Sequence, residues 1–112
     1  MTFDDHMSEE RIGKVLDYLS STDRSCAELK VNASRTEYLA KLQEAMAYKA
    51  VTVGNIEDRK AEAKMSPAVQ KAWDDHFAAV IAYEKVRALR EHGMLLTELW
   101  RSWNANRRTG NI

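Results

Sequence analysis

The chain has 112 residues, of which 45% are hydrophobic and 30% charged, and its 17 basic and 17 acidic side chains give a net charge of zero. This composition is typical of one globular domain spanning residues 1–112, and it excludes a disordered chain. The single cysteine excludes an internal disulfide and a zinc site built from thiolates. The start of the chain has no apolar signal segment, and no run approaches the ~20 apolar residues that span a bilayer. We therefore predict a cytoplasmic protein with no membrane partner (the host cytoplasm, if a phage encodes it).

The first predicted element is a short helix over residues 8–20, after a loose start over residues 1–7. Ser8 is placed to cap this helix, and Glu9 and Glu10 suit the positive end of its dipole. One apolar face recurs at helical spacing and consists of Ile12, Val15, Leu16 and Leu19. The polar run 20–23 predicts a turn that ends the helix.

A long helix is predicted next, over residues 25–53. Ser25 and Glu28 have the spacing of a capping box, which satisfies two free backbone N–H groups at a helix start. The predicted core stripe has heptad-like steps and consists of Leu29, Ala33, Leu39, Leu42, Met46, Ala50 and Val53, with Ile56 in phase.

Gly54 and Asn55 predict a break, because glycine accepts the left-handed conformation at a helix end and asparagine caps a following helix. Residues 54–65 form a charged connection, which the sequence allows to be either a separate solvated helix or a mobile arm. Ser66 and Pro67 then predict a second long helix over 66–103, with Gly93 as the one residue able to kink it. Its predicted core stripe consists of Val69, Ala72, Trp73, Phe77, Val80, Tyr83, Val86, Met94, Leu96, Thr97 and Trp100. Residues 104–112 are predicted to form a flexible basic tail.

The predicted fold is therefore all-α: a long antiparallel helical hairpin with a short N-terminal helix. Two helices bury only one seam, which is too little for the large side chains Trp73, Trp100, Trp103, Tyr38, Tyr48 and Phe77. Because contiguous exposed apolar surface normally marks an interface, we expect an oligomeric helical bundle whose first partner is the chain itself.

The sequence contains no strong catalytic or metal-binding pattern. His76 and His92 lie more than 20 Å apart on one helix, and Asp74, Asp75 and His76 point in different directions from a helix. Cys26 has no partner pattern, so a small core residue is the simpler interpretation. We predict no enzyme activity, no catalytic residue, no metal site and no cofactor.

Aromatic and basic side chains alternate near the C-terminus, which is the pattern of a surface for single-stranded nucleic acid. The predicted nucleic-acid-binding residues are Trp100, Trp103, Arg101, Arg107 and Arg108, with a second basic group at Arg59, Lys60 and Lys64. In the alternative interpretation the two tryptophans anchor the oligomer core, and the arginines pair with the acidic N-terminal segment of a neighbouring copy.

The layout resembles the UvsY-like recombination mediator proteins of phages. The resemblance covers roughly residues 25–108 and is carried by the charged helix ending at 44–50, the basic connection 59–64, the Met-Ser-Pro start at 65–67 and the long second helix. Residues 98–112 also look like the ending of small uncharacterised phage proteins. The resemblance implies a helical oligomer that binds single-stranded DNA and helps to load a recombinase onto DNA coated by single-strand-binding protein.

Two functions are therefore expected. The leading one is a phage accessory protein that binds single-stranded DNA, together with recombination or single-strand-binding proteins, as a recombination mediator does. The alternative is a phage-encoded inhibitor or adaptor that binds a host protein through an aromatic helix face and does not bind DNA.

Overall fold

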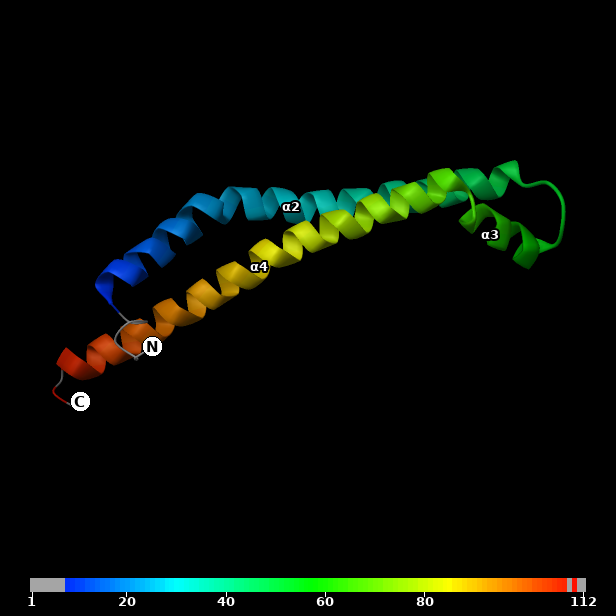
Figure 1. Ribbon diagram of the computed structural model, residues 1–112. Helices are drawn as coiled ribbons and strands as arrows, with labels where there is room; N and C mark the ends of the chain where they lie inside the picture. Colours follow the sequence, from blue (N-terminus) through cyan, green and yellow to red (C-terminus); the bar gives the residue numbers. More distant parts are fainter. Residues whose placement is uncertain (1–7, 109, 111–112) are drawn as a thin grey trace. The chain divides into compact units, whose positions relative to one another are not determined.

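A computed structural model describes residues 8–108 and residue 110 of the chain. These residues form helix α2 (Glu9–Ala50), helix α3 (Ile56–Lys64) and helix α4 (Pro67–Arg108), and none of them lies in a strand (Figure 1). The prediction of an all-α fold with two long helices is confirmed. The loose start predicted for residues 1–7 lies outside the described residues.

Helix α2 begins where its sequence predicts. The Ser8 hydroxyl oxygen accepts a hydrogen bond from the backbone N–H of Arg11 at 3.2 Å, and Glu9 and Glu10 occupy the first turn. Ser8 thus satisfies one of the N–H groups that a helix start leaves without a partner.

The predicted separate N-terminal helix is wrong, because α2 continues without a break through the expected turn at residues 20–23. The hydroxyl groups of Ser21 and Thr22 donate to the carbonyl oxygen of Tyr18, and the Ser25 hydroxyl donates to the carbonyl of Thr22. Small polar side chains can bond back to the preceding turn in this way, so they need not end the helix. Ser25 is therefore an interior residue of α2, and its predicted capping box is wrong.

The connection between the long helices contains the third helix. Helix α2 ends at Ala50, three residues before its predicted end, and Gly54 follows with φ at +101°. The side-chain oxygen of Asn55 accepts from the backbone N–H of Asp58 at 2.9 Å and caps α3. Of the two alternatives for residues 54–65, the structure therefore shows the separate helix.

Helix α4 begins at Pro67 as predicted, passes through Gly93 without interruption and ends at Arg108. The predicted end near 103 is wrong by about one turn, and residues 104–108 are helical rather than part of a flexible tail. Residues 109, 111 and 112 of the predicted tail lie outside the described residues.

Contacts along the chain group into two units. The terminal unit contains residues 8–26, 84–108 and 110, and the central unit is Ala27–Tyr83. In each unit a segment of α2 packs against a segment of α4 that runs in the opposite direction: Val15 meets Gly93 and Thr22 meets Arg90, whereas Thr36 meets His76. The expectation of one domain over residues 1–112 stays a prediction.

Small side chains form most of the buried core. The buried residues of the terminal unit are Ile12, Gly93 and Thr97, and those of the central unit are Ala40, Ala63, Val69 and Ala79. Small residues let helix backbones approach closely, and Gly93 is the clearest case. A Cβ atom added there would lie 3.1 Å from Cγ1 of Val15.

Much of the predicted core stripe of α2 is wrong. Leu39, Leu42, Met46, Ala50, Val53 and Ile56 are exposed, and the buried position of this segment is Ala40. On α4, Val69 and Thr97 are buried as predicted, but Phe77 and Met94 are exposed. The helices pack through alanine, glycine and threonine, and this arrangement leaves many of the larger side chains on other faces.

Candidate interaction surfaces

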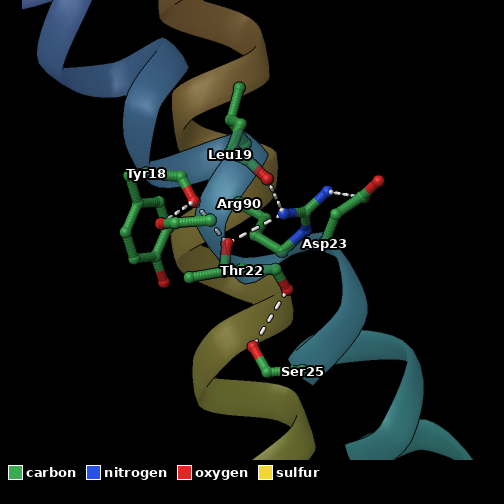
Figure 2. A network of polar contacts seen from close by, with 7 residues as sticks. Tyr18, Leu19, Thr22, Asp23, Ser25 and Arg90 are labelled. Atoms are coloured by element: carbon green, nitrogen blue, oxygen red, sulfur yellow. Dashed lines mark hydrogen bonds and ion pairs between the residues drawn. The ribbon is translucent and has the colours of Figure 1, made fainter.

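An arginine from α4 bonds to three groups of α2 within the terminal unit (Figure 2). The Arg90 guanidinium donates to the carbonyl oxygen of Leu19 at 2.6 Å, to the hydroxyl of Thr22 at 2.8 Å and to the carboxylate of Asp23 at 2.7 Å. The Arg90 side chain is only 14% exposed. A buried guanidinium needs several acceptors to offset its loss of water, and these three groups supply them.

The predicted nucleic-acid residues of the terminal unit all lie in the last three turns of α4. Trp100 and Trp103 are half-buried, whereas Arg101, Arg107 and Arg108 are exposed. Arg101 and Arg108 are seven residues apart and therefore share one side of the helix. Their guanidinium groups could meet phosphates from that side.

Arg107 already stacks on one of these tryptophans. Its guanidinium carbon lies 4.9 Å from the centre of the Trp103 ring, and the same group donates to the Asn104 side chain at 3.3 Å. The contact is a cation–π pair. Within the chain, one face of the Trp103 ring is therefore covered by a side chain that was predicted to bind phosphate.

The second predicted basic group lies in the central unit. Arg59 donates to the carbonyl oxygen of Val51 at 2.9 Å, and its guanidinium carbon lies 4.6 Å from the centre of the Tyr48 ring. These contacts tie α3 to the end of α2. Lys60 and Lys64 are exposed and line a shallow hollow with Lys41 and Tyr48.

Large apolar side chains project from the outer side of α2 in the central unit. Val31, Tyr38, Leu42 and Met46 are 66%, 67%, 42% and 56% exposed. Tyr38 and Leu42 lie two residues before and after the fully buried Ala40, which places them roughly 200° around the helix from it. Helix α2 therefore carries apolar residues both on its packed face and on the opposite side.

The same arrangement recurs on α4. Phe77 and Ile81, which are 56% and 55% exposed, lie two residues before and after the buried Ala79 in the central unit. In the terminal unit Leu95 and Leu99 flank the buried Thr97 in the same way and are 54% and 47% exposed. A surface helix of a monomer normally has one apolar face, and these segments have two.

His76 and Asp75, two residues of the Asp-Asp-His run, each contact another side chain of the protein. His76 Nδ1 lies 3.1 Å from the Thr36 hydroxyl, and Asp75 pairs with Lys71 at 3.1 Å. No group of three histidine, cysteine or acidic side chains within residues 8–108 is placed to hold a metal ion. Cys26 is half-buried with a free thiol.

Arg87 forms the densest charge cluster on the surface of the terminal unit. It donates to Glu84 through Nε at 2.7 Å and to Glu91 at 2.6 Å. These side-chain hydrogen bonds, that to Glu84 first, raise the pKa of Arg87 above its ordinary value.

Two residues that connect the helices, Arg90 and Gly93, were not predicted as such from the sequence, and Arg59 was predicted to bind a partner. Nothing local distinguishes Arg90 from other helical arginines, because its acceptors come from a helix about 70 positions earlier. Gly93 could have been recognised from the sequence, because a lone glycine inside a long helix often marks a close approach of another helix.

No segment of the described residues is apolar enough along its helix to cross a membrane. No protein-family model, curated protein or solved structure matches the chain. The resemblance to recombination mediators therefore stays an expectation from the sequence.

Proposed function

We propose that this chain is a binding protein that assembles with further copies of itself through the outer faces of its helices. The observation that supports the proposal is the pattern around Ala40, Ala79 and Thr97. Each of these buried small residues is flanked, two positions away on both sides, by exposed large apolar residues. Burying such side chains is worth roughly 25 cal/mol per Å² of apolar surface, which is the usual driving force for association.

Sedimentation velocity over a wide concentration range tests this function. We expect the wild-type chain to form oligomers that dissociate on dilution. The double variant Leu42→Gln/Ile81→Gln should stay helical and sediment as a smaller species. Ala61→Gln, at an exposed small residue of α3, is the control and should behave as wild type. A wild-type chain that sediments as a monomer at every concentration would contradict the proposal.

A second candidate function is the binding of single-stranded DNA, as in a phage recombination mediator. The observation that favours it is the end of α4, where three exposed arginines lie among half-buried tryptophans with no acidic residue after Glu98. In this function the chain would act with recombination or single-strand-binding proteins. If DNA binding is absent, the alternative is an inhibitor or adaptor that docks on a host protein.

Fluorescence anisotropy of a labelled single-stranded oligonucleotide at low and moderate salt tests the second candidate. We expect salt-sensitive binding that weakens in Arg107→Ala/Arg108→Ala more than in Lys14→Ala/Lys30→Ala. The two variants remove the same charge, so a difference locates the contact at the end of α4. Flat titrations at every salt concentration would exclude this function.

A further inference from the structure

The outer side of α2 in the central unit has the residue spacing of a coiled-coil seam. Val31, Arg35, Tyr38 and Leu42 follow one another in steps of four, three and four residues. All four are exposed, and we call them the outer α2 face. Such steps keep side chains in one line along a helix. The line contains one charged residue, Arg35, which pairs with no other residue in the part of the chain that the structure describes.

Helix α4 carries a second seam with the same steps. Gln70, Asp74, Phe77 and Ile81 are again separated by four, three and four residues, and all four are exposed. We call them the outer α4 face. Its one charged residue is acidic: Asp74 makes no ion pair with the described residues, unlike its neighbour Asp75, which pairs with Lys71.

The two faces match at three of their four positions when they are aligned in the same direction, and the fourth pair is Val31 opposite Gln70. Arg35 then stands opposite Asp74, Tyr38 opposite Phe77, and Leu42 opposite Ile81. The alignment pairs opposite charges, then two aromatic rings, then two branched aliphatic side chains. The buried alanines Ala40 and Ala79, behind the two faces, fall at the same level.

We propose that the outer α2 face of one copy packs in parallel against the outer α4 face of a second copy, with Arg35 and Asp74 setting the register. This inference rests on the self-assembly proposed above and specifies its interface.

Charge disfavours parallel contacts between two like faces. In a parallel contact between two outer α2 faces Arg35 would oppose Arg35, and between two outer α4 faces Asp74 would oppose Asp74. Like charges at such positions disfavour association. An antiparallel contact between the unlike faces would oppose Arg35 to Phe77 and Asp74 to Tyr38, and it would leave both charges without a partner in the seam.

The proposed contact is heterologous, because each copy uses two different surfaces. Every copy therefore offers one outer α2 face and one outer α4 face to two different neighbours. Such contacts produce closed rings when the rotation between copies closes, and open filaments when it does not. Assemblies larger than a dimer are expected.

Charge reversal followed by mixing tests the pairing. Arg35→Asp alone opposes two acids, and Asp74→Arg alone opposes two arginines. We expect each single variant to raise the dissociation constant by about tenfold or more in sedimentation velocity. In an equimolar mixture the two variants should assemble in alternation, because each contact between unlike copies then has one acid and one base. The double variant Arg35→Asp/Asp74→Arg should also assemble.

Two controls separate loss of assembly from loss of folding. Circular dichroism should show unchanged helix content in every variant. Lys30→Asp reverses an exposed charge of α2 that lies roughly 140° around the helix from Arg35, and it should assemble as wild type.

The outcomes that overturn the inference are distinct from those that overturn self-assembly. If the wild type forms oligomers and both single variants do so equally well, or if the double variant does not assemble, this interface is wrong and self-assembly stands. If the wild-type chain is a monomer at every concentration, the proposed function and this interface both fail.

Discussion

At the scale of single residues, three contacts decide how the helices pack. Arg90 supplies donors to α2 where its sequence resembles a turn, Gly93 removes a side chain where α2 approaches, and Arg59 connects α3 to the end of α2. Each contact joins residues that are distant in the sequence or lie on different helices. The partners of these residues are therefore visible only from the packed structure.

Replacement of Arg90 by alanine should destabilise the terminal unit by about 1–3 kcal/mol, because the carbonyl of Leu19 and the hydroxyl of Thr22 lose a charged donor. Urea unfolding followed by circular dichroism measures this change. Asp23→Asn is the matched comparison. The Asp23 side chain is largely exposed, so its ion pair with Arg90 should contribute less than about 1 kcal/mol. Equal losses in the two variants would contradict this account.

The two glycines inside helices should respond differently to alanine. Gly13 has no neighbouring atom within 4 Å of an added Cβ, so Gly13→Ala should stabilise the chain by roughly 0.5–1 kcal/mol. At Gly93 the added atom would press on Val15, and we expect Gly93→Ala to be less stable than Gly13→Ala. Thermal unfolding of both variants gives the comparison. If Gly93→Ala is as stable as Gly13→Ala, the close approach is not limiting.

At the scale of elements, the short helix α3 depends on a cap and on one side-chain contact. Its sequence is mostly charged and buries only Ala63. Asn55 supplies the cap, and Arg59 supplies the contact with Tyr48 and Val51. The cap at Asn55 and the helix break at Gly54 could be predicted from the sequence because their effects are local. The Arg59 contact could not, because an arginine in a basic cluster suits a phosphate equally well.

Arg59→Ala should loosen α3, because the helix then loses its hydrogen bond and ring contact with the end of α2. Hydrogen exchange should accelerate for the amides of residues 56–64 and change little in the middle of α2 and α4. Lys60→Ala changes the adjacent exposed residue and should leave exchange as in wild type. Unchanged exchange in Arg59→Ala would show that the contact does not hold α3.

At the scale of the whole molecule, the apolar surface is divided between the packed faces and outer faces. Only five apolar residues among those described are buried: Ile12, Ala40, Ala63, Val69 and Ala79. Three of the five are alanines, which contribute little apolar area each. The stability of the chain should therefore depend on what covers the outer faces.

We expect the midpoint of thermal unfolding to rise with protein concentration, because association stabilises the folded chain by mass action. Calorimetry or circular dichroism over a hundredfold concentration range measures the shift. The variant Leu42→Gln/Ile81→Gln should show a smaller shift. A midpoint that is independent of concentration in the wild type would mean that the outer faces do not contribute to stability through association.

The features that the sequence by itself determined are those that depend on local chemistry. Ser8, Gly54, Asn55 and Pro67 set helix ends through backbone conformation and hydrogen bonds to near neighbours, and the scarcity of glycine and proline predicted the two long helices. The sequence also placed Ile12 and Val69 on apolar faces that are buried, but tertiary structure decided the rest of the core. The sequence pattern predicted that Leu42, Met46 and Phe77 lie in the core. The helices instead approach each other closely at small residues, so Ala40 and Ala79 are buried and the three larger residues are exposed. The turn expected at residues 20–23 is helical, and Arg90 from the other long helix bonds to groups of α2 there.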